Sequence, residues 1–263
     1  MTRLPLTRTV CVIPARMAAS RYPGKPLAPM LGLPLVLHVW HRCRLAAGLE
    51  RVVVATCDQV IFDAVTKAGG QGVMTADTHA GCVDRTVEAI ANLDLGLAPD
   101  DFVLMVQGDE VMVAPEMITR MIEVYTATRA PVVNLASLIT DPADHDDPNC
   151  VKICAAPDDR VLFFSRSPIP SRSRMKGPLK AYQQTGIIGF SREFLETFGT
   201  LSRTPLELDE QIDMLRTLEH GYPIRIVRTD TTTIGVDTPS DRERGEEMLA
   251  ADPVTARYLD RPQ

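Results

Sequence analysis

Hydrophobic residues in the first half of the chain form short uninterrupted runs. Residues 9–15, 51–57 and 101–109 read TVCVIPA, RVVVATC and DFVLMVQGD. Such runs are typical of strands that are buried on both faces, because a strand with one solvated face alternates polar and apolar residues. A further short strand is predicted at 72–75. The first half therefore carries four predicted strands.

The segments between these runs have apolar residues at helical spacing. LPLVLHVWHRCRLAAG predicts a helix that ends at Gly48, and DQVIFDAVTKAGG predicts a helix with Asp58 as N-cap and Gly69 as C-cap. A third helix is predicted over 84–93. Strands that alternate with helices form βαβ units and a parallel sheet. We therefore expect an α/β fold with a doubly wound sheet.

The pattern changes in the second half. VKICAAPDDRVLFFS has two apolar runs around a turn and predicts a β-hairpin, and the polar, basic stretch PIPSRSRMKGPLKAYQQ predicts an inserted arm. A strand at GIIGF, two helical segments between Arg192 and His220, a strand at IRIVRT and a last helix from Ser240 follow. We expect one domain over 1–263 with an arm at about 140–190.

Composition narrows the class of protein. An apolar fraction of 45 % and a charged fraction of 24 % are ordinary for a soluble domain, and no apolar run has the length of a membrane span. The sequence thus predicts a cytoplasmic protein with no membrane partner. A net charge of −6 argues against a nucleic-acid partner, which requires clustered Lys and Arg. The cysteines contain no Cys-x-x-Cys pair and are expected to be free thiols: Cys11, Cys43, Cys57, Cys82, Cys150 and Cys154.

A basic loop, VIPARMAASRYPGKPL, connects the first strand to the first helix. In an open α/β sheet this position is the carboxyl end of a strand, where ligands bind. Backbone N–H groups of the loop, together with Arg16, Arg21 and Lys25, would attract an anion. The loop therefore predicts a polyphosphate site, while a solvated basic loop with a proline turn remains the alternative.

Two well-known phosphate loops are excluded. A Walker A loop would require Gly at position 19 and Ser or Thr at position 26, where the sequence has Ala19 and Pro26. No G-x-G-x-x-G fingerprint follows the first strand. The loop belongs to neither class.

Carboxylates at two other strand ends favour the phosphate interpretation. VQGDE places Gln107, Asp109 and Glu110 where a buried strand ends, and GVDTPSD places Asp237 after a strand-like run, before a helix with Ser240 as its expected cap. Each aspartate alone could be a turn or cap residue. Together, opposite a basic loop, they would hold Mg²⁺ against phosphate oxygens.

Five separated stretches resemble one enzyme family. VIPARMAASRYPGKPL, VQGDE, CVKI, VLFFSRSPIPSR and GVDTPSDRER occur in the order and at roughly the spacing of CMP-Kdo synthetases, the 3-deoxy-manno-octulosonate cytidylyltransferases, over nearly the whole chain. The resemblance implies a Rossmann-like nucleotidyltransferase fold with a mainly parallel sheet, a homodimer to which the arm contributes, and Mg²⁺ as cofactor. It also implies CTP and a small anionic acceptor as substrates, with transfer of CMP and release of pyrophosphate.

The resemblance also implies roles for individual residues. Arg16, Lys25, Asp109 and Asp237 would form the catalytic group, with the two aspartates as Mg²⁺ ligands. The expected nucleotide-binding residues are Pro14, Ala15, Arg16, Ser20, Lys25, Asp84, Arg85 and Gln107. The expected acceptor-binding residues are Gln107, Arg166, Gln184, Asp213 and Met214.

The chain departs from the family on the acceptor side. Where the family has HIGIYGY, this chain has QTGIIGF, so Gln184 stands for the His and Ile188 and Phe190 replace aromatic hydroxyls. Asp213 and Met214 stand where the family has Glu-Gln in LEQLR, and AGCVDR replaces SGTER. Lost hydrogen-bond partners change acceptor selectivity, so the acceptor is expected to be a Kdo-like acid or a compact phosphonate such as phosphonoformate. Kdo itself, a sialic-type acid and a catalytically silent nucleotide-binding module remain alternatives.

Overall fold

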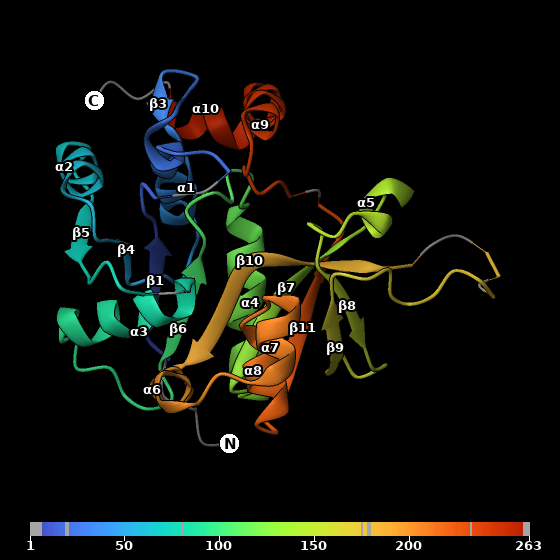
Figure 1. The fold of residues 1–263 in the computed structure, drawn as a ribbon. Coiled ribbons are helices and arrows are strands. Elements are labelled where there is room, and N and C mark those ends of the chain that lie inside the picture. The colour runs from blue at the N-terminus through green and yellow to red at the C-terminus, as the bar shows by residue number, and fades with distance from the viewer. Residues whose placement is uncertain are drawn as a thin grey trace.

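A mixed sheet of nine strands forms the centre of this computed structural model (Figure 1). Its main path has the order β11-β7-β10-β6-β1-β4-β5, and β8 and β9 extend the sheet from β10. The strands of the main path are β1 (Thr9–Pro14), β4 (Arg51–Thr56), β5 (Gln71–Met74), β6 (Phe102–Val106), β7 (Val132–Leu138), β10 (Tyr182–Ser191) and β11 (Ile224–Thr229). The structure describes residues 7–18, 21–79, 81–174, 176–177, 180–231 and 233–259.

The sheet is mainly parallel, with one strand reversed inside it. Strands β5, β4, β1 and β6 are parallel to one another, as are β11 and β7. Strand β10 lies antiparallel between β6 and β7. Its first residues also pair with β8 (Lys152–Ala155), which forms an antiparallel hairpin with β9 (Val161–Ser165). The predicted α/β fold with an inserted hairpin is confirmed.

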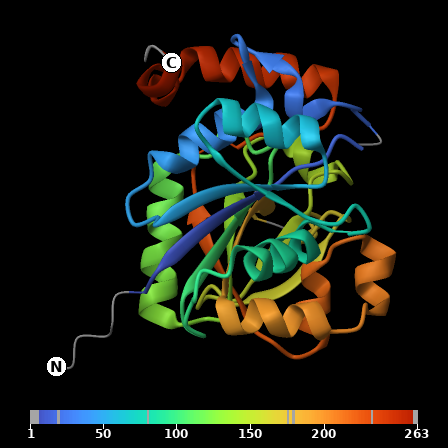
Figure 2. The ribbon, with the colours of Figure 1, turned by 90° about the vertical axis from the view of Figure 1, so that its left-hand side faces the viewer.

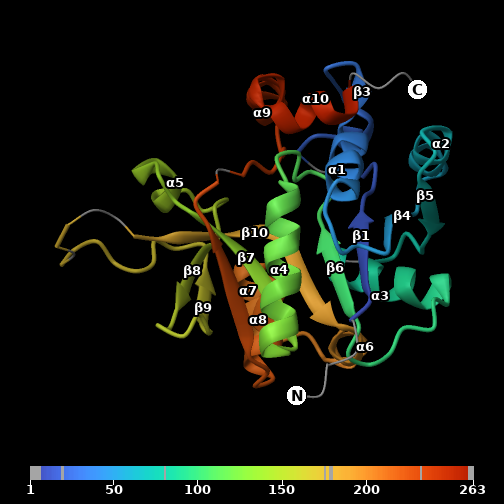
Figure 3. The ribbon, with the colours of Figure 1, turned by 180° about the vertical axis from the view of Figure 1, so that it is seen from behind.

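Helices cover both faces of the sheet (Figures 2 and 3). Because side chains alternate along a strand, Cys11 and Ile13 of β1 enter one apolar core, and Val10 and Val12 enter the other. The first core includes α1 (Leu35–Arg44), α2 (Gln59–Lys67), α4 (Pro115–Thr128) and α9 (Pro239–Ala251), and the second includes α3 (Cys82–Leu93), α6 (Arg192–Thr200) and α8 (Met214–Glu219). Shorter elements are η1 (Lys25–Leu27), β2 (Pro29–Met30), β3 (Leu33–Pro34), α5 (Pro142–Asp146), α7 (Pro205–Glu210) and α10 (Pro253–Leu259).

The C-terminal helices pack against the start of the chain. The hydroxyl of Tyr258 in α10 lies 2.8 Å from Nδ1 of the buried His38 in α1. Glu246 of α9 accepts a 2.6 Å hydrogen bond from the backbone N–H of Leu31. These contacts hold the segment before α9 close to the basic loop, although the two are far apart in sequence.

Three local predictions were wrong. The run 233–236 does not form a strand, because its contact with the sheet region is one bridge between Gly235 and Glu110. Thr238, and not Ser240, is the N-cap of α9, since its hydroxyl accepts a hydrogen bond from the N3 backbone N–H. The helices α6, α7 and α8 stand where two helical segments were predicted.

The cysteine prediction is confirmed. All six cysteines are free thiols, of which Cys11 and Cys43 are buried and the others are partly exposed. Within the described parts of the chain, none of the helices combines the length and apolar character needed to cross a bilayer.

Candidate active site

The basic loop is held by its own backbone and by the second helix. Gly24 donates a 3.1 Å hydrogen bond to the carbonyl of Met17, whose N–H donates to the carboxylate of Asp58 at 2.8 Å. Asp58 occupies the N-cap position of α2 as predicted, but its side chain holds the loop instead of capping the helix. Gly24 has a φ of +77°, a conformation that favours glycine, and turns the chain so that the Lys25 side chain enters the site.

A cleft of about 270 Å³ lies between this loop and the carboxyl ends of the parallel strands. Its walls bring together the four cations Arg16, Arg21, Lys25 and Arg85. Of the residues predicted to bind the nucleotide, the cleft is lined by Pro14, Ala15, Arg16, Lys25, Arg85 and Gln107. Ser20 lies outside the described residues.

Asp84, the remaining predicted nucleotide residue, is directed elsewhere. Its Oδ1 lies 3.6 Å from Nη1 of Arg216, and Asp84 is not part of the cleft wall. Arg216 is also paired with the buried carboxylate of Glu207 at 2.5 Å. Asp84 therefore belongs to a charge group with Arg216 and Glu207.

Arg85 has an unused donor at the cleft. Its Nη1 donates to the hydroxyl of Thr75 at 2.5 Å and to the carbonyl of Ala76 at 3.1 Å, whereas the buried Nη2 has no partner among the described residues. A buried guanidinium N–H without an acceptor is unfavourable, so a polar ligand in the cleft would satisfy it. The geometry suits an acceptor atom of a nucleobase or phosphate.

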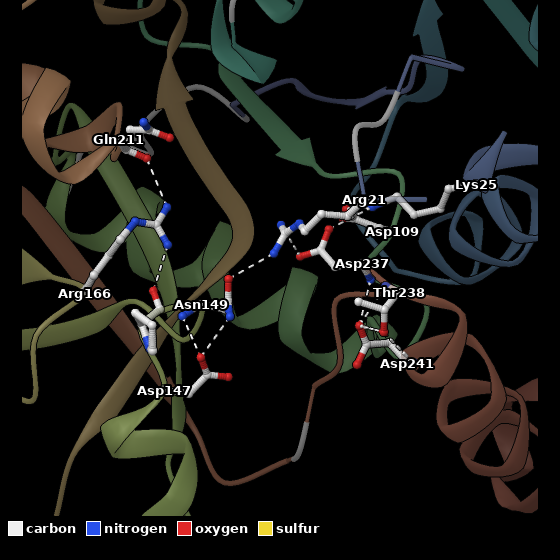
Figure 4. Close-up of polar contacts among 11 residues, drawn as sticks. Arg21, Lys25, Asp109, Asp147, Asn149, Arg166, Gln211, Asp237, Thr238 and Asp241 are labelled. Carbon is white, nitrogen blue, oxygen red and sulfur yellow. Dashed lines mark hydrogen bonds and ion pairs between the residues drawn. The ribbon is translucent and has the colours of Figure 1, made fainter. Parts of the chain in front are cut away.

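Two carboxylates and two cations of the cleft wall meet (Figure 4). Nζ of Lys25 lies 2.7 Å from Oδ2 of Asp109 and 3.1 Å from Oδ1 of Asp237. Arg21 donates from Nη2 to Oδ2 of Asp237 at 2.8 Å. The Val236 N–H donates to the backbone carbonyl of Asp109 at 3.1 Å, which brings the two aspartates to one place.

Lys25 remains charged in this position. Burial lowers the pKa of its ammonium group, but the carboxylates of Asp109 and Asp237 more than offset this, and the net pKa is raised. The two carboxylates already share one cationic group, and hard oxygen donors of this kind are the ligands that Mg²⁺ prefers. The residues therefore fit a Mg²⁺ site whose further ligands would come from substrate and water.

A second cavity, of about 520 Å³, adjoins the first. The two cavities share Arg21, Gln107, Asp109 and Asp237, so molecules bound in both would meet at the aspartates. The predicted acceptor residues that line the second cavity are Gln107, Arg166, Gln184 and Asp213. Met214 is fully buried and is not part of the wall.

Each side-chain nitrogen of Arg166 already has one acceptor. Its Nε donates to the carbonyl of Glu210 at 2.6 Å, Nη1 to the carbonyl of Pro148 at 2.9 Å and Nη2 to the carbonyl of Gln211 at 3.3 Å. Arg166 thus joins two segments of the cavity wall. Arg172, the next arginine of the arm, is paired with Asp146.

A bulge in β10 shapes the floor of the second cavity. The pairing of β10 with β7 shifts register between Gln184 and Ile188, and the backbone of Gly186 exchanges hydrogen bonds with two residues after β6. Its carbonyl accepts from the Gln107 N–H at 2.8 Å, and its N–H donates to Oε1 of Glu110 at 2.5 Å. A Cβ at Gly186 would lie 2.8 Å from the Gln107 side chain, so glycine is required there.

Comparison with known proteins identifies the family. The family described as Cytidylyltransferase matches residues 10–227. This chain belongs to the cytidylyltransferase family. A 3-deoxy-manno-octulosonate cytidylyltransferase of Syntrophobacter fumaroxidans is 40 % identical over 251 residues, covering 95 % of this chain and 100 % of that protein. An 8-amino-3,8-dideoxy-manno-octulosonate cytidylyltransferase of Shewanella amazonensis is 40 % identical over 245 residues, covering 92 % and 98 %.

A solved structure gives the same result. A CMP:2-keto-3-deoxy-manno-octonic acid synthetase complexed with CTP superimposes with a TM-score of 0.86 at 32 % identity, covering 93 % of this cytidylyltransferase and 99 % of that chain. The sequence resemblance to CMP-Kdo synthetases is therefore confirmed.

Some residues of this cytidylyltransferase site had no predicted role. Glu110 was noted only for its place after a strand, yet it is buried, and burial together with Asp109 raises the pKa of its carboxyl to about 7. Asn149 and Gly186 had no sequence signal, because their positions depend on the arm and on a bulge. Cys82 lines the cationic cleft, where burial and two nearby carboxylates raise the pKa of its thiol to about 12.

Proposed function

We propose that this cytidylyltransferase uses CTP to transfer CMP to an extended sugar acid of the Kdo class and releases pyrophosphate. The observation that carries the proposal is the meeting of Asp109, Asp237 and Lys25 where a cationic cleft joins a second, larger cavity. The names of the relatives and the CTP complex of the solved structure support the same activity. A silent nucleotide-binding module would have no need of paired metal carboxylates.

The chemistry requires positioning and charge neutralisation. A hydroxyl oxygen of the acceptor attacks the α-phosphorus of CTP and forms a new P–O bond, while the bond to the bridging oxygen breaks and pyrophosphate leaves with the electron pair. The proton of the hydroxyl passes to solvent. Arg16, Arg21 and Lys25 line the cleft and would neutralise the phosphate charge. Bound at Asp109 and Asp237, Mg²⁺ would add a further positive charge at the reacting phosphate.

The second cavity favours an extended acid over a compact phosphonate. Its volume of about 520 Å³ is far larger than phosphonoformate requires. A small trianion would also be repelled by the acidic wall, because like charges in a cavity raise each other's energy. The carboxylates of that wall outnumber its arginines: Asp109, Glu110, Asp141, Asp144, Asp147, Asp213, Asp237 and Asp241 against Arg21, Arg166 and Arg244.

Association into a homodimer is part of the proposal. The β8–β9 hairpin lies at one side of the molecule (Figure 1), and Leu162 of β9 is 54 % exposed. An exposed apolar side chain on a hairpin at the side of the molecule suits a contact with a second copy. Light scattering of the purified protein tests this, with Leu162→Glu expected to shift it toward the monomer. Because CTP is an intracellular nucleotide, we also infer that the enzyme works in the cytoplasm.

A pyrophosphate-release assay tests the proposed function. Purified enzyme with CTP and Mg²⁺ is given Kdo, 8-amino-Kdo, a sialic acid or phosphonoformate in turn. We expect release with a Kdo-type acid and little with phosphonoformate, and no release when GTP replaces CTP. If pyrophosphate were released with phosphonoformate and with none of the other acceptors, the acceptor would be a compact phosphonate and not a sugar acid.

A further inference from the structure

We propose that Lys25 and Arg21 occupy the carboxylates of the metal site while no triphosphate is bound, so that the divalent cation enters with the nucleotide and not before it. The inference rests on the proposed function, because it takes a nucleoside triphosphate as the ligand of the cationic cleft. It assigns to these two residues the control of metal access as well as contact with phosphate.

Three of the four carboxylate oxygens already have cationic partners, including both oxygens of Asp237. Oδ2 of Asp109 and Oδ1 of Asp237 both accept from Lys25, at 2.7 and 3.1 Å, and the second oxygen of Asp237 accepts from Arg21 at 2.8 Å. A divalent cation that both aspartates bind would need an oxygen of Asp237 at about 2.1 Å, and both of these oxygens are held by Lys25 or Arg21, so the cation would lie close to these side chains. Like charges at such a separation repel strongly, so free metal and Lys25 exclude each other.

Lys25 has no easy alternative position in the absence of an anion. Its side chain is only 11 % exposed, and a buried ammonium group without a partner is strongly unfavourable. A triphosphate in the adjoining cleft would supply new acceptors for Lys25 and Arg21, which both line that cleft. The two aspartates would then be free to bind the metal. The two cations would be paired with phosphate and the two carboxylates with the metal, so no charge would be left unpaired.

Arg21 also contacts a residue in the wall of the second cavity. Its Nη1 donates to Oδ1 of Asn149 at 3.1 Å, while Nη2 holds Asp237 (Figure 4). Asn149 is fixed in turn by the carboxylate of Asp147, which accepts from its backbone N–H at 2.8 Å and from its side-chain Nδ2 at 3.0 Å. Both residues line the acceptor cavity. When Arg21 turns to phosphate, the hydrogen bond between the basic loop and Asn149 is therefore lost.

Direct titration with Mn²⁺ tests the proposal without turnover. Mn²⁺ alone is added to ligand-free protein, and the free ion is followed by electron paramagnetic resonance. We expect Lys25→Met to bind Mn²⁺ at least about tenfold more tightly than the wild type, because the competing charge is gone. The matched control Lys67→Met, which removes an exposed lysine of α2, should bind as the wild type does. Adding Asp237→Asn to Lys25→Met should remove the gain.

The outcomes separate this inference from the proposed function. Equal Mn²⁺ affinity of the wild type and Lys25→Met would refute the proposal that Lys25 competes with the metal for the two aspartates. Calorimetry with premixed Mn²⁺ and CTP then examines the function itself, since failure of the complex to bind wild-type enzyme would count against the proposed activity. Circular dichroism checks that Lys25→Met folds; should it fail to fold, Arg21→Met gives the same comparison through the freed Oδ2 of Asp237.

Discussion

The side-chain Nε2 of Gln184 donates a 2.9 Å hydrogen bond to Oδ1 of the buried Asn134 in β7. Nδ2 of Asn134 lies 3.4 and 3.3 Å from the carbonyls of Thr185 and Ile187, on either side of the bulge glycine. Gln184, which stands where the family has a histidine, is therefore fixed by Asn134 of the sheet. The same asparagine holds the bulge that forms the floor of the acceptor cavity.

Replacement of Gln184 should affect stability and acceptor binding together. Gln184→Leu leaves Oδ1 of Asn134 without its donor, which should lower the free energy of unfolding by about 1 to 3 kcal/mol. The KM for the acceptor should rise while the KM for CTP changes little, because Gln184 lines only the second cavity. Urea denaturation and steady-state kinetics measure both effects. An equal rise in both KM values would argue against a separate acceptor cavity.

The metal carboxylates should be essential for turnover and unimportant for folding. Asp109→Asn and Asp237→Asn each remove one charged ligand at a partly exposed site and no core contact. We expect kcat to fall by about a thousandfold or more, equivalent to roughly 4 kcal/mol of transition-state stabilisation. Melting followed by circular dichroism should show little change. Near-normal Mg²⁺-dependent turnover in either variant would refute the assignment.

Lys152 should be a structural residue of the acceptor wall. Its fully buried ammonium group donates to the carbonyls of Asp147, Cys150 and Arg166 at 2.7, 2.5 and 2.5 Å. Lys152→Met leaves three carbonyls without a donor, so the free energy of unfolding should fall by about 3 kcal/mol. The measurement is equilibrium unfolding in urea, with Lys67→Met as control. A variant as stable as the wild type would show that water replaces the ammonium group without cost.

Asp213 should give a pH-dependent contribution to stability. Burial raises the pKa of its carboxyl to about 6, and the Asp84 carboxylate adds to the effect against the opposing Arg216. The contribution is present below about pH 4 and is lost as pH rises through 6, because the folded protein binds the proton more tightly than the unfolded chain does. Asp213→Asn does not undergo this loss of stability, because an asparagine side chain does not titrate. Relative to the wild type, its free energy of unfolding should therefore increase by about 2 kcal/mol between pH 4 and pH 7. A constant difference across that range would contradict the assignment.

The parallel sheet, and the position of the basic loop opposite Asp109 and Asp237, could be predicted from the sequence. Buried strands are continuous apolar runs, Asp109 follows such a run, and Lys25 and Asp237 stand in recognisable motifs. These positions depend mainly on local structure, and the topology of an α/β sheet then brings strand ends to one edge. The β8–β9 hairpin could also be predicted, because two apolar runs flank a turn there.

The acceptor side could not be predicted as well, because it depends on tertiary packing. Phe190 and Met214 replace polar family residues, yet both are fully buried, so Phe190→Tyr and Met214→Gln would place polar groups in the core. Asp84 faces Arg216 and not the cleft. Sequence position alone does not show which of two neighbouring side chains reaches a cavity, and a bulge such as that at 184–188 changes the answer for every residue beyond it.

The most direct test of the central claim is the identity of the products. Wild-type enzyme is incubated with CTP, Mg²⁺ and a Kdo-type acid, and the mixture is followed by ³¹P NMR. We predict loss of the CTP signals and equal appearance of pyrophosphate and a new CMP phosphodiester, both absent with Asp237→Asn. Unchanged CTP with every sugar acid, or release of inorganic phosphate without a phosphodiester, would contradict the account.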